Sequence, residues 1–258
     1  INYKILFNYL KKAKVPVVWT FHDCWGFTGH CSHFTMVKCE QWKTHCSYCP
    51  QLRSYPTCYT KGAVKENYNR KRACFTGLEN LTIVTPSKWL AELVKESFLQ
   101  DYDIRVINNG IDLTKFQPKT NTSFRIEHDL EGKITILGVA SEWSDRKGYS
   151  DFIKLSRKLS PNQKLVMVGV SDKQLEELPK SIIAIKKTNS VEELAEIYSA
   201  ADVFLNFTYE DNFPTVNLEA MACGTPVITY KTGGSVEPIT EETGFIIDQG
   251  DYMAALNL

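Results

Sequence analysis

Two carboxylates spaced eight residues apart, Asp211 and Glu219, lie between two apolar runs in the C-terminal half of the chain. Each run is typical of a buried β-strand. Pro214 favours the start of a helix and Gly224 favours its end, so we expect Glu219 on a short helix and Asp211 in the loop before it. A loop and helix start just past the end of a parallel strand is where open α/β sheets bind nucleotides.

A basic pair, Arg146 and Lys147, follows a second apolar run at 134–140 and precedes Gly148 and an expected helix. Fixed cations and the N–H groups of a helix start stabilise negative charge best when they are already in position. Arginine offers a two-pronged donor and lysine a point charge, so the pair suits an anionic ligand. Ser141 adds a hydroxyl to the same turn. The alternative is that the two basic side chains are solvated at a helix start and bind no ligand.

A histidine, His22, follows the expected strand at 15–20 in the run TFHDCW. A neutral imidazole at the carboxyl end of a strand can donate a hydrogen bond to a ligand without competing with the basic pair for the ligand's negative charge. The alternative is a structural histidine at a strand end. Asp23 would orient the imidazole or bind a second substrate.

The segment from Asp211 to Glu219, followed by AMACGTPVI, resembles the donor-site signature of glycosyltransferase family four. Members of that family are retaining enzymes with the two-domain GT-B fold. Their second glutamate holds the ribose of a nucleotide sugar and their first carboxylate faces the sugar, roles that the resemblance gives to Glu219 and Asp211. The family more often has glutamate at the first position. Aspartate is shorter, so the sugar sits closer or water fills the gap; Glu210 would be the equivalent only after a one-residue slip.

The resemblance also implies how the reaction proceeds. The acceptor hydroxyl attacks the sugar on the same face from which the diphosphate leaves. The leaving phosphate helps to deprotonate that hydroxyl. The resemblance implies that catalysis needs no cofactor, because the basic pair takes the place of a metal ion. It also implies that the donor is a UDP- or GDP-sugar. The implied catalytic residues are His22, Asp211, Arg146 and Lys147, and the implied donor-binding residues are Ser141, Arg146, Lys147, Asp211, Asn212, Phe213, Pro214 and Glu219.

Six of the eight cysteines fall between Cys24 and Cys58, inside an α/β pattern and not across a small secreted domain. This favours a reduced compartment with either a local zinc site or packed free thiols, with disulfides as a third reading. Cys46-x2-Cys49 has the spacing of one half of a zinc site, and Cys31 and Cys39 would complete four thiolates. Similar cysteine- and tryptophan-rich segments occur in a bacterial branch of the family linked to surface polysaccharide assembly. Aromatic rings in the segment offer faces for a sugar, namely Trp25, Phe27, Trp42 and Tyr48.

The chain has 258 residues with 30 basic and 30 acidic side chains. Zero net charge argues against a nucleic-acid-binding protein, which is normally basic. No apolar run approaches the roughly 18–20 residues of a membrane span. The sequence begins at Ile1, and its last residues read as a helix that has just begun. We therefore expect a fragment of a longer protein.

Strands alternate with helices along the whole chain, which predicts parallel sheets joined by right-handed crossovers. The expected strands span 15–20, 81–86, 104–110, 134–140, 164–170, 182–187, 203–207, 226–228 and 244–248. The expected helices span 2–14, 61–72, 87–98, 149–159, 173–178, 190–200 and 214–223.

The expected fold is α/β of the GT-B type, with two Rossmann-like, doubly wound domains facing a cleft. Residues 1–113 form a partial acceptor-side domain with a cysteine-rich insertion at 24–58, residues 114–131 a linker, and residues 132–258 the donor-binding domain. The first domain shows about three strands where a doubly wound domain usually has about six, so we expect its N-terminal part to be incomplete.

The sequence therefore predicts transfer of a sugar from a nucleotide donor to a hydroxyl of a glycan or lipid-linked glycan, with retention, in polysaccharide and cell-envelope biosynthesis. The resemblance implies a cytoplasmic enzyme, at the inner face of the membrane where the acceptor is lipid-linked. A sugar-nucleotide epimerase of the same fold would need acid and base carboxylates that we cannot place. Two further alternatives are a non-catalytic nucleotide-sugar-binding relative and a zinc-dependent interaction module centred on the cysteines.

Overall fold

The computed structural model describes residues 2–120 and 123–258, and the chain divides into two compact units, Ile1–Asn108 and Asn109–Leu258. The division falls a few residues before the expected domain end at 113. The expected linker 114–131 belongs to the second unit, because helix α4 (Ser123–Glu127) packs against helix α7 (Val191–Ala200). Phe124 and Leu130 are buried there, but two inward apolar residues are too few to give a readable helical period.

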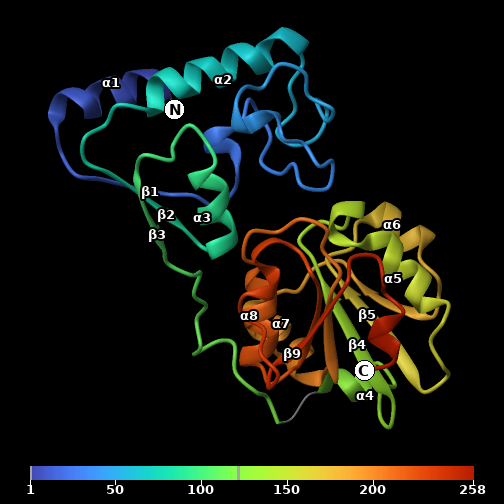
Figure 1. Cartoon of the computed structure of the whole chain (residues 1–258). Helices are drawn as coiled ribbons and strands as arrows, with labels where there is room; N and C mark the ends of the chain where they lie inside the picture. The colour runs from blue at the N-terminus through green and yellow to red at the C-terminus, as the bar shows by residue number, and fades with distance from the viewer. Residues whose placement is uncertain (1, 121–122) are drawn as a thin grey trace. The chain divides into compact units, whose positions relative to one another are not determined.

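The first unit is built on a three-stranded parallel sheet in the order β1-β2-β3 (Figure 1). Its strands are β1 (Val17–Thr20), β2 (Leu81–Thr85) and β3 (Asp103–Val106), and its helices are α1 (Tyr3–Ala13), α2 (Lys61–Phe75) and α3 (Lys88–Lys95). Helices α1 and α2 pack side by side. Ser87 caps α3, since its hydroxyl accepts a hydrogen bond from the Leu90 N–H at 3.0 Å.

The segment between β1 and α2 is mostly irregular, with short 3-10 turns at η1 (Trp25–Phe27) and η2 (Gln41–Lys43). Phe27 is fully buried and Trp42 is 2% exposed, so these two rings form a core and do not offer faces to a sugar, whereas Tyr48 is exposed. The sequence cannot show this because the segment has no period. Lys71 of α2 is also buried, and its Nζ donates hydrogen bonds to the carbonyl oxygens of Trp25 at 2.6 Å and Thr28 at 3.0 Å.

The second unit contains a six-stranded parallel sheet in the order β6-β5-β4-β7-β8-β9. Its strands are β4 (Ile134–Val139), β5 (Gln163–Val168), β6 (Ile182–Ile185), β7 (Val203–Asn206), β8 (Val227–Tyr230) and β9 (Gly244–Ile247). Counted from the first strand of the unit, this order is 3-2-1-4-5-6, that of the Rossmann fold. The strand order reverses between β4 and β7, and ligands of such sheets bind just beyond the carboxyl ends of the strands at that point.

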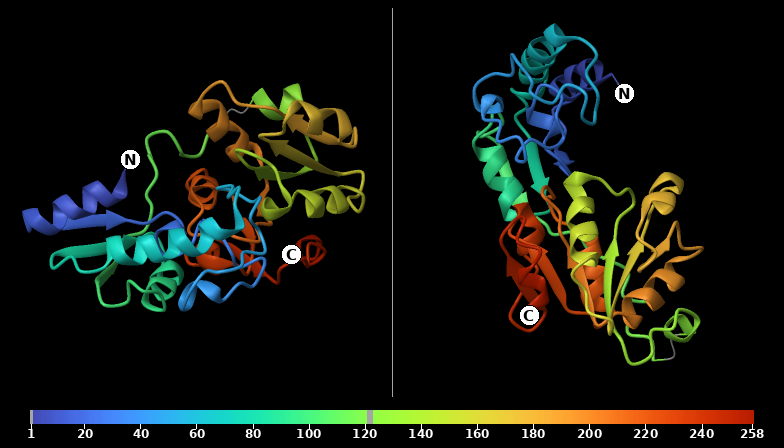
Figure 2. Two further views of the ribbon diagram at one scale, coloured as in Figure 1. Left: turned by 90° about the horizontal axis from the view of Figure 1, so that it is seen from above. Right: turned by 90° about the vertical axis from the view of Figure 1, so that its right-hand side faces the viewer.

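Helices cover both faces of this sheet, and Figure 2 shows the two layers from further directions. Neighbouring residues of β4 serve opposite faces, as the period of a strand requires. Leu137 packs in the core formed with α7 and α8 (Thr215–Ala222), whereas Ile136 packs in the core formed with α5 (Tyr149–Ser156). Helix α6 (Asp172–Glu177) follows β5. All nine expected strands and all seven expected helices are present in the described residues, and α4 is the addition.

Ser190 and Glu193 have the spacing of a capping box at the start of α7, and the box forms only in part. The Ser190 hydroxyl accepts from the Glu193 N–H at 3.1 Å. The Glu193 carboxylate, however, accepts from the N–H of Asn189 at 2.6 Å, one residue before the cap. The helix start is therefore still satisfied, with the second bond shifted by one residue.

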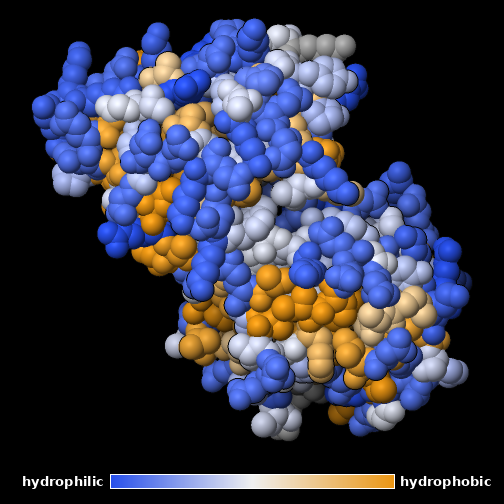
Figure 3. All heavy atoms as spheres, viewed as in Figure 1, coloured by the Kyte–Doolittle hydropathy of each residue, from blue (hydrophilic) through white to orange (hydrophobic). Residues whose placement is uncertain are grey.

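The surface is mixed in polarity. Most of the face seen in Figure 3 is hydrophilic, with apolar patches on both units. Val18 on β1 and Val106 on β3 are among the exposed apolar side chains of the small sheet. Among the described helices, none has both the length and the apolar character that a membrane span requires.

Candidate functional site

The loops that follow β4 and β7 meet at the point where the strand order reverses. The Arg146 guanidinium donates a hydrogen bond to the Glu210 carbonyl oxygen at 3.1 Å. In return, the Arg146 carbonyl oxygen accepts from the Tyr209 N–H at 2.8 Å. We call the loop 207–214, which carries Asp211, the carboxylate loop. The reciprocal bonds hold the basic pair against this loop.

Lys147 and Asp211 form an ion pair at this junction, with Nζ 2.6 Å from Oδ2. Their side chains are only 22% and 16% exposed, so the pair is held in one geometry and is partly shielded from solvent. The carboxylate that meets the cation is Asp211, whereas the Glu210 side chain is buried. The structure thus brings together the two charges that the sequence places 64 residues apart.

Gly148 allows the close approach of these two loops. Its φ is 75°, and a Cβ atom there would lie 2.3 Å from the Phe207 carbonyl oxygen. We expect Gly148→Ala to lower the free energy of unfolding by at least about 2 kcal/mol, from backbone strain and the clash together. The measurement is the urea unfolding midpoint.

Gly132→Ala is the matched control, because Gly132 has φ 70° and no atom within 4 Å of the added Cβ. Its free energy of unfolding should fall by about 1 kcal/mol, the cost of a left-handed backbone conformation without a clash. Equal losses in the two variants would show that the approach of the loops is not the constraint at Gly148.

Glu219 lies on α8, which begins at Thr215 with Pro214 as its N-cap residue, one position later than expected. Its Oε2 accepts a hydrogen bond from the Tyr198 hydroxyl at 3.0 Å. Burial raises the pKa of the Glu219 carboxyl, and hydrogen bonds from Tyr198 and Thr215 lower it by less. Glu219 is therefore a partly buried, fixed acceptor in the second turn of α8.

The rest of the carboxylate loop is also fixed. Asn212 and Phe213 are buried, and the Phe213 carbonyl oxygen accepts from the Asn109 side-chain amide at 3.1 Å. The Gly234 N–H donates to the Asp211 carbonyl oxygen at 3.3 Å, so the two-glycine turn at 232–235 lies against this loop. A buried amide pair, Asn206 and Asn217, connects β7 to α8 at 2.8 Å.

Asp151 of α5 connects Tyr209 to Tyr230 of β8, and no local sequence pattern marks it. Its carboxylate accepts hydrogen bonds from the hydroxyls of Tyr209 at 2.6 Å and Tyr230 at 2.8 Å, and from Lys154 Nζ at 3.0 Å. Burial raises the pKa of Asp151, but these hydrogen bonds outweigh burial and hold it below its usual value. Its contribution to stability is therefore present at neutral pH and is lost as pH falls through the folded-state pKa.

We expect Asp151→Asn to cost about 1.5–3 kcal/mol at pH 7, the range for hydrogen bonds to a charged group. The difference from the wild type should begin to shrink below about pH 4, the ordinary pKa of aspartate, because the unfolded chain then binds a proton that the folded carboxylate still lacks. It should vanish only below the lowered pKa of the folded state. Unfolding free energies in urea at both pH values test this. The control is Asp172→Asn, since the Asp172 side chain is 80% exposed and should give little change at either pH. A difference for Asp151→Asn that stays constant with pH would contradict the account.

Two further predicted site residues are exposed just after strand ends. Ser141 is exposed just after β4, and His22 is exposed just after β1 in the first unit. Asp23 accepts a hydrogen bond from the Trp25 N–H at 2.7 Å, so it shapes the turn that carries His22. The roles of Ser141 and His22 stay predictions.

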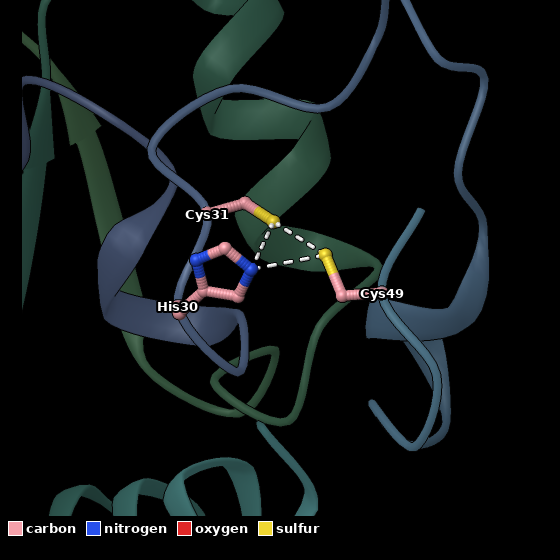
Figure 4. A group of neighbouring side chains, drawn as sticks. All are labelled: His30, Cys31 and Cys49. Carbon is pink, nitrogen blue, oxygen red and sulfur yellow. Dashed lines mark hydrogen bonds between the residues drawn. The ribbon is translucent and has the colours of Figure 1, made fainter. Parts of the chain in front are cut away.

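The cysteine segment contains a group that the sequence identified only in part. His30, Cys31 and Cys49 bring one ligand atom each to within 4.8 Å of one another (Figure 4). Cys39 and Cys46 line the same small pocket without belonging to this group of three. All eight cysteines are free, so the disulfide reading is wrong. His30 was missed because its partner Cys49 lies 19 residues away, and only the dipeptide His30-Cys31 could have pointed to it.

A larger hollow, of about 650 Å³, opens beside Pro16, Asn80 and Asp103 in the first unit. These residues lie at the amino ends of β1, β2 and β3. Parallel sheets bind ligands at the carboxyl ends of their strands, so we do not place the functional site in this hollow.

Comparisons with known proteins agree with this geometry. The family model for "Glycosyl transferases group 1" matches residues 120–257. A putative colanic acid biosynthesis glycosyl transferase, WcaC of Escherichia coli K12, is 26% identical over 275 residues, covering 100% of this chain and 64% of WcaC. A D-inositol 3-phosphate glycosyltransferase of Stackebrandtia nassauensis is 27% identical over 203 residues, covering 69% of this chain and 46% of that protein.

Solved structures show the same fold. Anabaena Alr3699/HepE in complex with UDP superimposes with a TM-score of 0.69 at 17% identity, covering 99% of this chain and 64% of that one. Sucrose-phosphate synthase of Thermosynechococcus elongatus gives a TM-score of 0.63 at 24% identity, covering 81% and 55%. The chain thus spans about half to two thirds of the length of these relatives. Since the family model covers more than half of the chain, the chain belongs to the glycosyl transferase group 1 family, glycosyltransferase family four, with the GT-B fold.

Proposed function

We propose that this chain carries the donor site of an enzyme that transfers a hexose from UDP to a hydroxyl of a glycan, with retention of anomeric configuration. One observation carries the proposal most directly. The pair Lys147–Asp211, held by Arg146 at the switch point of a Rossmann-type sheet, places fixed cations and a carboxylate where such sheets bind nucleotides.

Each part of the donor has a matching group in the second unit. The Glu219 carboxylate, which already accepts a hydrogen bond from the Tyr198 hydroxyl, would accept further ones from the ribose hydroxyls. Arg146 and Lys147 bind the diphosphate, and Asp211 with Asn212 meets the sugar hydroxyls. Phe213 and Pro214 shape the loop, and Ser141 adds a hydroxyl near the phosphates. His22 of the first unit contacts the sugar or phosphate.

The reaction needs stabilisation of a leaving group more than it needs a nucleophile from the protein. The bond from the sugar C1 to the phosphate oxygen breaks, and its electron pair stays on the diphosphate. The acceptor oxygen forms the new bond to C1, and its proton goes to the leaving phosphate. Arg146 and Lys147 stabilise the added negative charge, because they are positioned before the bond breaks.

UDP is proposed as the nucleotide because the structures of Anabaena Alr3699/HepE hold UDP and UDP-glucose. A surface polysaccharide or its lipid-linked precursor is proposed as the acceptor because WcaC is described as a colanic acid biosynthesis enzyme. The enzyme would then act in the cytoplasm, at the inner face of the membrane when the acceptor is lipid-linked.

The test uses the full-length protein with UDP-, GDP- and ADP-sugars. We expect thermal stabilisation by UDP and its sugars above that by the other nucleotides, and release of UDP when an acceptor glycan is added. NMR of the product should show the anomeric configuration of the donor. Stabilisation by none of the nucleotides, or a product of inverted configuration, would overturn the proposal.

A further inference from the structure

The cysteine-rich segment of the first unit has the geometry of a metal centre. We propose that it binds one structural zinc ion through His30, Cys31 and Cys49, with Cys46 as the fourth ligand. This proposal is independent of the transfer reaction, because it concerns only side chains of the first unit.

The spacing of the three ligand atoms fits a tetrahedral ion. Zinc bonds of about 2.3 Å to sulfur and about 2.05 Å to nitrogen imply sulfur–sulfur edges of about 3.8 Å and nitrogen–sulfur edges of about 3.6 Å. The Cys31–Cys49 sulfur distance is 3.6 Å, and the Cys31 sulfur lies 3.6 Å from His30 Nε2. His30 Nε2 lies 2.9 Å from the Cys49 sulfur, so this edge lengthens by about 0.7 Å when an ion replaces the hydrogen bond.

The histidine is oriented as metal-bound histidines usually are. His30 is buried, and its Nδ1 lies 2.9 Å from the Pro56 carbonyl oxygen. A carbonyl can only accept, so Nδ1 carries the proton and Nε2 keeps the lone pair that faces the sulfurs. Such a second hydrogen bond fixes the tautomer and the ring direction of zinc ligands. Figure 4 shows Nε2 directed toward both sulfurs.

Cys46 is the fourth ligand on three grounds. It forms the Cys-x2-Cys pair with Cys49, which is a common zinc-binding spacing. It is 9% exposed and lines the same pocket as the other three. Its sulfur accepts a hydrogen bond from the N–H of Gly29 at 3.3 Å, next to His30, and a Cβ on Gly29 would lie 2.9 Å from the Cys46 Cβ.

A buried cation lies close enough to balance the charge of this centre. Zinc with three thiolates and one neutral imidazole carries a net charge of −1. Lys71 is 2% exposed, bonds to Trp25 and Thr28, and rests 3.6 Å from the centre of the Trp25 ring. Burial lowers the pKa of Lys71 to about 7, and the charges of Asp23, Cys46 and Cys31 oppose that shift. Buried charges are normally compensated, so a zinc–thiolate centre of charge −1 would favour the ammonium form of Lys71.

The consequence for the fold is a crosslink. The ligands join residues 30–31 to residues 46–49 across a segment that has almost no regular secondary structure. On binding, three thiols lose their protons to solvent and the ion takes their place, so affinity should fall at acidic pH. Zinc binding would hold in place the loop that follows His22.

The first test measures metal in the full-length protein purified without added chelator. We expect one zinc ion per chain by elemental analysis, and X-ray absorption that fits three sulfur ligands and one nitrogen ligand. Replacement by Co²⁺ should give the visible absorption of a tetrahedral thiolate site. A protein without zinc that also fails to bind added Zn²⁺ or Co²⁺ would overturn the proposal, and so would a site with iron or with four sulfur ligands.

Variants then assign the ligands. Cys31→Ser, Cys46→Ser and Cys49→Ser should each lose zinc, whereas His30→Cys should keep it with a changed Co²⁺ spectrum. The controls are Cys39→Ser, which tests the remaining cysteine of the pocket, and Cys58→Ser, whose thiol bonds to the Thr60 carbonyl instead. Both controls should keep one zinc ion. Retention in Cys31→Ser and Cys49→Ser, or loss in Cys39→Ser with retention in Cys46→Ser, would overturn the assignment.

Discussion

Replacement of Lys147 by methionine is expected to lower kcat for sugar transfer about 10²- to 10³-fold, the cost of removing one fixed group that stabilises developing negative charge. Methionine keeps much of the side-chain length but removes the ammonium. The Kd for UDP should rise by a smaller factor than kcat falls, because the charge on the diphosphate grows as the bond to the sugar breaks. Steady-state kinetics with a UDP-sugar, combined with calorimetric titration of UDP, separate the two effects.

The ion pair with Asp211 provides the control for this prediction. If Lys147 served only to hold Asp211, Asp211→Asn would cost as much as Lys147→Met, and the double variant would cost no more than either. We expect instead that the double variant is slower than Asp211→Asn alone. A Lys147→Met enzyme with wild-type kcat would contradict the proposed role of the cation.

Glu219→Gln is expected to weaken UDP binding and at the same time to stabilise the unliganded fold. The loss of charged hydrogen bonds to the ribose should cost about 1.5–3 kcal/mol, or about 10- to 150-fold in Kd. Burial raises the pKa of Glu219, so the ionised carboxylate reduces stability as pH rises through that value. Glutamine removes this penalty and its carbonyl can still accept from Tyr198.

The two effects have opposite signs and are measured on the same sample. Thermal unfolding without ligand should occur at a higher temperature than in the wild type at pH 7, and the shift produced by UDP should be smaller. Glu176→Gln is the control, since Glu176 is exposed on α6 and should alter neither quantity. A Glu219→Gln protein that is less stable without ligand would show that the carboxylate is structural.

The strands, the helices and the position of the carboxylate loop could all be predicted from the sequence. These features are local: an apolar run marks each strand, and Pro214, Ser87 and Gly224 mark helix ends within a few residues. The placement of Asp211 and Arg146 at one edge of a sheet then follows from the rule that parallel strands end on the same side.

The side-chain networks could not be predicted in the same way. Asp151 meets Tyr209 and Tyr230 across 58 and 79 residues, and no local pattern marks such a pairing. The same holds for His30 and Cys49, and for the aromatic core around Trp42. In an irregular segment, packing depends on contacts distant in sequence, and periodicity gives no information about them.

We expect the nucleotide to bind at the carboxyl ends of β4 and β7. Hydrogen–deuterium exchange of the full-length protein with and without UDP would locate its binding site. The amides in 140–148 and 207–219 should become protected when UDP binds, and this protection should be smaller in Glu219→Gln. Protection at the amino ends of β1, β2 and β3, with no change in those two segments, would contradict it.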